Sequence, residues 1–170
     1  MTWTAPQVPD VNGPLVGADR PILEAFLASQ RAGLINKCAG LTGEQLAQAV
    51  VPPSNLTLLG LVRHMAKVER TWFRQRFGPG DVEQMYDAAL GKDADFEDLE
   101  PARAEDDFSR YFEECRLADA AVADTSFDET IEHRGEVMSL RLVYVHMVRE
   151  YAQHIGHADL LRERIDGRTG

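Results

Sequence analysis

The sequence LRLVYVHMVREYAQHIGHADLLRERID, residues 140–166, carries the strongest structural signal in the chain. On a helical wheel at ~100° per residue, one arc of roughly 120° collects both apolar and polar members of this stretch. They are Leu142, Val143, His146, Glu150, His154, His157, Leu160 and Leu161. The arc is apolar at both ends and polar in the middle, whereas Tyr144 and Arg162 fall on the other side. We expect a long final helix, from about Ser139 to Ile165, whose arc points at the core.

Three more helices are expected before this one, because apolar residues recur at helical spacing and breakers follow them. The first begins at Asp19, as an N-cap, and ends near Cys38. The second is capped by Ser54 or Asn55 and continues to about Phe77, and the third spans residues 104–123. We predict a connector at residues 41–53, with one short turn at 43–47. We predict an irregular segment at residues 130–137. Residues 81–101 predict a long loop, of a kind that often covers a site.

Four main helices joined by longer loops predict an all-α fold, specifically a four-helix bundle. The first 18 residues contain Pro6, Pro9, Gly13, Pro14 and Gly17, which are too many breakers for a helix. We therefore predict an extended N-terminal arm over residues 1–18 and a bundle domain over residues 19–170. A chain of 170 residues suits one such domain.

The charge balance argues against nucleic acid as a partner. The formal net charge is −10 at pH 7 and no Lys/Arg cluster stands out, whereas a phosphate backbone needs a basic face. No apolar stretch is long enough to cross a bilayer and no secretory signal is visible, so we expect no membrane partner and, by default, a cytoplasmic location. Cys38 and Cys115 lie far apart and outside any CxxC motif, which favours two inert thiols.

A candidate metal site follows from the polar middle of the arc. Glu150 and His154 are four positions apart, so their side chains project from adjacent turns of one helix face and can reach one ion. His64 lies in the apolar row Leu61, His64, Met65, Val68 of the second helix, which must pack against a neighbouring helix. Taken singly, each residue is also compatible with a hydrogen-bonded core position. Together they predict a divalent metal held by His64, Glu150 and His154, with coordination positions left open.

Other polar residues have weaker patterns. His157 shares the arc, and we expect it to line the cavity or to contact a ligand from behind. His146 is expected in a similar supporting position or in the core, and His133 outside the site. Arg63, Arg149 or Arg162 would suit a carboxylate of cofactor or substrate, although a solvated helix face is the commoner reason for such residues.

The segments EYAQHIGHADLLRERIDGRTG and LTLLGLVRHMAKVERTWF resemble the DinB-like superfamily of four-helix-bundle metalloproteins, in particular a branch of unknown function common in actinobacteria. The resemblance covers nearly the whole chain from Asp19 onward, and it implies an up-down-down-up bundle, a homodimer and a metal at one end of the bundle. Many members bind the ion through three histidines, the last two four positions apart and followed by Gln. Here those positions carry Glu150, His154 and His157, which is similar to the His/Glu/His set of mycothiol-dependent maleylpyruvate isomerases.

This resemblance implies a thiol-dependent enzyme. Relatives are linked to low-molecular-weight thiols such as mycothiol, and a metal produces a thiolate at neutral pH that attacks a small electrophile. We expect an S-transferase or isomerase that uses a small-molecule substrate, a thiol cofactor and a divalent metal. Zinc comes first, and nickel, iron and manganese also tolerate this ligand set. Two alternatives stay open, namely a non-catalytic metal-binding stress-response or sensor protein and a metal-dependent hydrolase.

Overall fold

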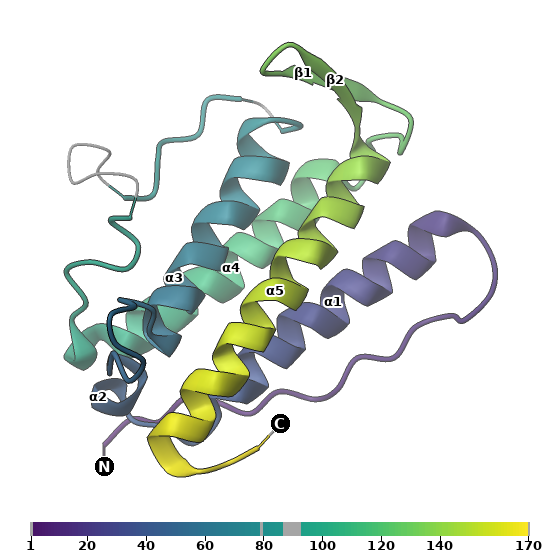
Figure 1. The fold of residues 1–170 in the computed structure, drawn as a ribbon. Coiled ribbons are helices and arrows are strands. Elements are labelled where there is room, and N and C mark those ends of the chain that lie inside the picture. The colour runs from purple at the N-terminus through teal and green to yellow at the C-terminus, as the bar shows by residue number, and fades with distance from the viewer. Residues whose placement is uncertain (1, 79, 87–92, 170) are drawn as a thin grey trace.

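The computed structural model describes residues 2–78, 80–86 and 93–169 (Figure 1). The described chain is mostly helical, which confirms an all-α class. The α-helices are α1 (Asp19–Cys38), α2 (Gly43–Leu46), α3 (Leu58–Glu69), α4 (Ala104–Val122) and α5 (Leu140–Asp166). A π-helix, η1 (Arg70–Gln75), continues α3, and a short 3-10 helix, η3 (Pro101–Arg103), precedes α4. Two strands, β1 (Thr130–His133) and β2 (Glu136–Ser139), lead into α5.

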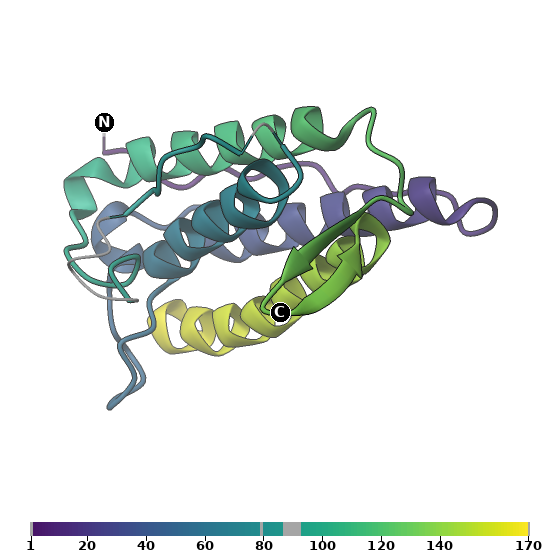
Figure 2. The ribbon, with the colours of Figure 1, turned by 90° about the horizontal axis from the view of Figure 1, so that it is seen from above.

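The four long helices α1, α3, α4 and α5 lie side by side, and the hairpin stands at the end where α5 begins (Figures 1 and 2). α1 packs mainly against α5 and α3 mainly against α4, while α3 and α5 also touch each other. The last pair brings together the helices that carry the candidate ligands, His64 on α3 and Glu150 and His154 on α5. In the described residues no helix is long and apolar enough to cross a membrane.

The helix limits agree with the sequence prediction to within a few residues, and the differences lie at the N-caps. Ala18 is the N-cap of α1, and Asp19 is its first helical residue. α3 begins later than expected, because Thr57 is its cap and accepts a hydrogen bond from the backbone of Gly60 at 2.9 Å. Ser139 caps α5, as the expected start of that helix requires.

The expectation of an irregular segment at residues 130–137 was wrong. Thr130 pairs with Ser139 and His133 with Glu136 in an antiparallel hairpin. Its two-residue turn, Arg134–Gly135, has both φ angles positive, at 56° and 81°. Such turns match the right-handed twist of paired strands, but Asn-Gly or Asp-Gly is their usual signature. Arg-Gly between polar residues gives too weak a sequence signal to predict a hairpin.

The buried face of α5 is rotated from the predicted arc. Tyr144 is only 2% exposed and Arg162 6%, although both were placed on the outer side. Leu142 and Leu160, which were placed in the core, are 50% and 61% exposed. Arg162 is buried because its Nη1 donates to the carbonyls of Lys37 and Ala39, each at 2.9 Å, where α1 has no further helical donors. The polar stripe therefore lies at the edge of the core and not at its centre.

A buried polar network crosses all four long helices. Glu69 of α3 is completely buried and accepts two hydrogen bonds from Arg31 of α1, at 2.7 and 2.8 Å. The hydroxyl of Tyr151 in α5 donates to the same carboxylate at 2.7 Å and lies 3.0 Å from that of Tyr111 in α4. Asp119 of α4 accepts from the other side of the Arg31 guanidinium at 2.8 Å. An ionised carboxylate at such depth is tolerated only because this set of partners is complete.

Replacing Arg31 with Leu is expected to lower the free energy of unfolding by about 3–5 kcal/mol, because it leaves the Glu69 carboxylate buried without its cation. Urea unfolding followed by circular dichroism measures the change. The matched control is Arg116→Leu, which removes a surface ion pair with Glu113 and should barely move the unfolding midpoint. Equal effects of the two substitutions would contradict the structural importance of the network.

Candidate metal centre

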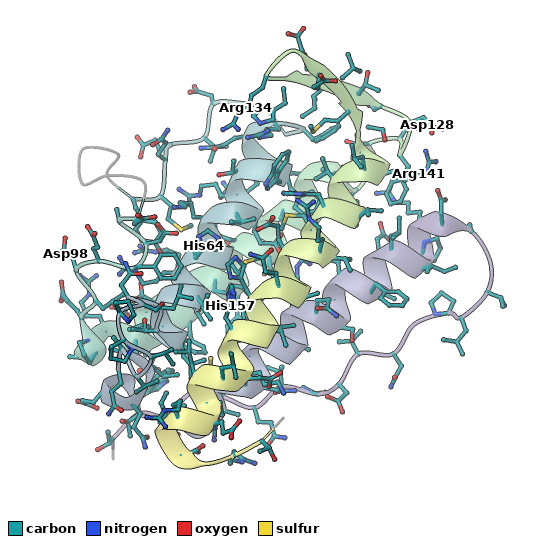
Figure 3. All side chains as sticks on the ribbon, in the orientation of Figure 1. His64, Asp98, Asp128, Arg134, Arg141 and His157 are labelled. Atoms are coloured by element: carbon teal, nitrogen blue, oxygen red, sulfur yellow. The ribbon has the colours of Figure 1, made fainter. Side chains whose placement is uncertain are left out.

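His64, Glu150 and His154 converge where α3 and α5 touch. Each offers one ligand atom, and these atoms all lie within 4.8 Å of one another. Nε2 of His154 is 3.8 Å from Oε2 of Glu150, and the rings of His64 and His154 meet edge to face with centroids 4.8 Å apart. Figure 3 shows His64 on α3 and His157 on α5 on the same side of the molecule.

The donor set fits a divalent cation. Two donors that bind one ion at ~2.1 Å can be at most ~4.2 Å apart, and the Glu150–His154 pair already meets this limit. All the ligand atoms lie within 4.8 Å of one another, so a small side-chain rotation brings the widest separation within this limit. Two imidazoles and one carboxylate are ligands that zinc, iron, nickel and manganese all accept.

The cluster is reachable from solvent, because it lies at the edge of the core. The His154 side chain is 10% exposed, but those of His64 and Glu150 are 21% and 22% exposed. Three protein ligands with an open side are typical of catalytic metal sites, whereas structural zinc sites are closed by four.

Asp95, which the sequence analysis did not single out, orients His64. Its Oδ2 is 2.6 Å from Nδ1 of His64, and its Oδ1 accepts a hydrogen bond from Lys67 at 2.6 Å. With Nδ1–H donated to the carboxylate, Nε2 of His64 carries the free lone pair. This carboxylate–histidine pairing is the usual support of a metal-binding imidazole. Asp95 lies in a loop without periodicity, so nothing in the sequence marks it.

The loop that carries Asp95 is held against α3 by several contacts. Arg63 donates to the carbonyls of Asp95 and Ala94 at 3.0 and 3.2 Å. The ring of Phe96 stacks on that of His64 with centroids 5.3 Å apart, and it packs on Gly60 one turn earlier. The predicted long loop over residues 81–101 thus does contact the site through Asp95 and Phe96, and its part at 87–92 lies outside the described residues.

Burial and neighbouring charges set the ionisation of the site. Burial lowers the pKa of His154 to about 4, and the nearby His64 and His157 act in the same direction, so its imidazole is neutral and able to bind a metal at pH 7. Burial by itself raises the pKa of Asp95, but the hydrogen bonds from His64 and Lys67 outweigh burial and lower it. Asp95 is therefore ionised and can accept the hydrogen bond from Nδ1–H of His64.

The remaining histidines differ in their distance from the cluster. Nδ1 of His157 is 3.4 Å from Nδ1 of His154, which places His157 behind that candidate ligand. Nε2 of His146 is 3.8 Å from Oε1 of Glu150, and its ring lies against Trp72. His133 lies in the hairpin, where it contacts Trp72 and no candidate ligand.

The arginines and cysteines also differ in whether they can act at the site. Arg63 and Arg162 hold backbone carbonyls, so neither is available as the carboxylate-binding group considered above. Arg149 is 70% exposed and its Nη2 lies 3.6 Å from Oε1 of Glu150. Burial raises the pKa of Cys38 to about 12 and, with the nearby Glu69 carboxylate, raises that of Cys115 as well. Both thiols are free but protonated at neutral pH, so the protein itself supplies no thiolate.

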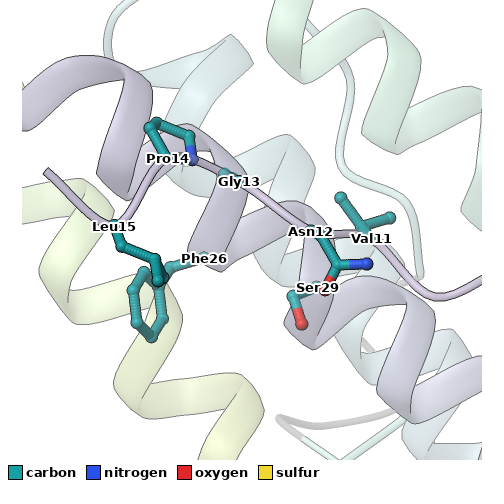
Figure 4. Close-up of a pocket in the computed structure, with 8 residues that line it drawn as sticks. Val11, Asn12, Gly13, Pro14, Leu15, Phe26 and Ser29 are labelled. Atoms are coloured by element: carbon teal, nitrogen blue, oxygen red, sulfur yellow. The ribbon is translucent and has the colours of Figure 1, made fainter.

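One cavity of about 140 Å³ lies far from this chemistry, between the N-terminal arm and α1 (Figure 4). It is lined by Val11, Asn12, Gly13, Pro14, Leu15, Ala25, Phe26 and Ser29. Closer to the N-terminus, Ala5 of the arm is buried. Its N–H donates to the carbonyl of Leu41, and its carbonyl accepts from the N–H of Gly40. None of the candidate ligands borders this cavity, so it gives no support to a site there.

Two histidines and a glutamate gather between α3 and α5 of a helical fold. The protein therefore falls in the class of helical proteins with an open candidate metal centre. A family model described as mycothiol-S-transferase matches residues 22–167. The chain therefore belongs to the mycothiol S-transferase family, in agreement with the DinB-like resemblance of its sequence. Searches of curated proteins and of solved structures returned no significant match.

Gly60→Ala is expected to displace the loop that holds Asp95. A Cβ at Gly60 would lie 2.6 Å from Cδ1 of Phe96 and 2.9 Å from Oγ1 of Thr57, so Phe96 must move. We expect the cost of this overpacking, about 1–3 kcal/mol, to exceed the gain of about 1 kcal/mol from helix propensity. Urea unfolding and limited proteolysis of the loop measure the two effects.

Gly156→Ala in α5 is the control, since its added Cβ meets nothing within 4 Å. That substitution should raise the free energy of unfolding by up to about 1 kcal/mol and leave the proteolysis pattern unchanged. A stabilised Gly60→Ala protein with an unchanged loop would refute the close approach.

Proposed function

We propose that this protein is a metal-dependent S-transferase that joins a mycothiol-type thiol to a small electrophile, with the metal held by His64, Glu150 and His154. The convergence of these three side chains is the observation that carries the proposal. Membership of the mycothiol S-transferase family supports the thiol and the transfer. Zinc is the first choice of metal, followed by nickel, iron and manganese.

A bound divalent ion supplies one piece of chemistry here, which is to lower the pKa of a coordinated thiol so that a thiolate exists at neutral pH. The chain supplies the rest. Asp95 fixes the His64 ring so that Nε2 faces the site, and His157 contacts the Nδ1 side of His154. The half-open side leaves room for thiol and electrophile to enter.

The transfer itself balances simply. The sulfur forms a bond to the electrophilic carbon, the leaving group departs with the electron pair of the broken bond, and the thiol proton passes to solvent. An external thiol is required, because Cys38 is buried, Cys115 is partly buried and the pKa values of both are raised. For an electrophile that rearranges instead of losing a group, the same attack followed by loss of the thiol gives the isomerase variant.

The finer details of the fold form part of the same proposal. We propose an up-down-down-up four-helix bundle formed by α1, α3, α4 and α5, supported by the helix directions visible in Figure 1 and by the pairing of α1 with α5 and α3 with α4. The arm at residues 1–18, the homodimer and the cytoplasmic location remain predictions of the sequence analysis.

Metal content is the first test. We expect near-stoichiometric metal in the purified untagged protein and loss of nearly all of it in His64→Ala and His154→Ala, measured by plasma mass spectrometry. His133→Ala is the matched control, because His133 lies in the hairpin away from the three ligands, and it should keep its metal. A parent protein that cannot be loaded with zinc, nickel, iron or manganese would refute the metal centre.

Thiol conjugation is measured on the loaded protein with mycothiol and several electrophiles. Transfer that disappears with the metal supports the proposed function. A metal-loaded protein that binds no thiol and conjugates no electrophile would instead support the non-catalytic metal-binding alternative.

Asp95→Asn should weaken metal affinity by about 10–100-fold, because the amide removes the negative charge behind His64 while keeping the side-chain shape. Competition with a chromogenic chelator measures the affinity. Asp98→Asn is the control within the same loop, since Asp98 has a positive φ of 50° that Asn also tolerates. Equal affinities in Asp95→Asn and the parent would show that the carboxylate does not act on the metal.

A further inference from the structure

An apolar cavity of about 240 Å³ lies directly beside the candidate metal centre. It is formed by η1, β2 and the first half of α5, and is lined by Trp72, Met138, Leu142, Val143, Val145, His146 and Arg149. Two of these residues also touch a candidate ligand, because Nε2 of His146 is 3.8 Å and Nη2 of Arg149 is 3.6 Å from Oε1 of Glu150. The cavity and the metal centre therefore share a wall.

The cavity presents a preformed aromatic surface. The indole of Trp72 is flanked by the His146 ring, with centroids 4.4 Å apart, and by the Arg76 guanidinium, 3.8 Å from the ring centre. Trp72 lies in the π-helix η1, a distortion that is frequent at functional sites. These contacts hold the indole in place, and Trp72 is one of the residues that line the cavity.

The exposed apolar side chains of α5 gather at the same place. Leu142 and Val145 are each about half exposed and both line the cavity. They are not needed by the core, because the buried face of α5 is formed by other residues such as Val143 and Met147. Apolar side chains left open beside a reactive centre gain free energy when a non-polar ligand covers them.

The size of the cavity suits a compact ligand. A cavity of ~150 Å³ holds one benzene molecule, so about 240 Å³ has room for a substituted aromatic ring. The polyhydroxylated part of a mycothiol-type thiol does not match walls of Trp, Leu, Val and Met. The apolar part of the electrophile does.

We propose that this cavity binds the aromatic or similarly compact apolar group of the electrophile, so that the preferred substrates are single-ring, benzyl-type electrophiles. This inference rests on the proposed function. A benzyl group in the cavity would place its reactive carbon toward His146 and Glu150, on the side of the metal centre. The sulfur–carbon bond then forms as the carbon–halogen bond breaks, the halide leaves with the electron pair, and the thiol proton goes to solvent.

Binding is tested first without turnover. The chain has two tryptophans, so Trp3→Phe leaves Trp72 as the single fluorescent indole. p-Nitrobenzyl alcohol, an unreactive aromatic quencher, should quench this protein saturably, whereas nitromethane should quench it only by collision. Adding Leu142→Lys should abolish saturation. Adding Leu160→Lys, on the same helix but outside the cavity, should preserve it.

Specificity is tested with the metal-loaded enzyme and mycothiol. The ratio of kcat/KM for benzyl bromide to that for bromoacetamide should fall about tenfold in Leu142→Lys and stay constant in Leu160→Lys, since a filled apolar pocket discriminates on this scale. An unchanged ratio, with transfer intact, would overturn the inference but leave the proposed function standing. Saturable quenching with no transfer to any electrophile would overturn the proposed function instead.

A second copy of the chain is the competing occupant of this apolar surface. Sedimentation velocity of Leu142→Lys separates the two cases. If Leu142→Lys changes the oligomeric state and the parent protein shows only collisional quenching, the surface is a protein contact. That result would overturn the inference.

Discussion

The buried ion pair between Arg31 and Glu69 constrains the whole molecule. Glu69 is completely excluded from water, and its charge is tolerable only while Arg31 from α1 and Tyr151 from α5 both reach it. Tyr111 and Asp119 add α4 to the same network. Because α1 and α5 both supply partners to this carboxylate of α3, none of these three helices can rotate without depriving Glu69 of a hydrogen bond. The network favours the observed rotation of α5, in which Tyr151 faces Glu69.

That rotation decides where the candidate metal ligands lie. Tyr151 points inward to Glu69, so its neighbour Glu150 must point to the side, and His154 lies one turn further along the same edge. Both meet His64 at the contact of α3 with α5 and stay partly open to solvent. Had the stripe pointed to the centre of the core, a metal there would have been sealed off. The buried charge network and the open position of the candidate metal ligands are consequences of one helix orientation.

The outer wall of the centre is built from two other segments. On one side, the loop after η1 brings Asp95 to His64, and Gly60 makes the approach possible because it has no side chain to meet Phe96. On the other side, the hairpin and η1 form the apolar cavity that shares His146 with the centre. A polar, metal-compatible cluster between an orienting carboxylate and an apolar pocket suits the joining of a polar thiol to a non-polar electrophile.

Local patterns in the chain were enough to predict the four long helices and to single out His64, Glu150 and His154, because helical periodicity and i, i+4 spacing depend only on neighbouring residues. The expected core arc of α5 was wrong, since Tyr144 and Arg162 are buried through partners on other helices that no wheel can show. The hairpin and the role of Asp95 were missed for the same reason. Strand pairing, helix rotation and the support of His64 depend on contacts between residues far apart in the chain, and these contacts exist only once the helices have packed.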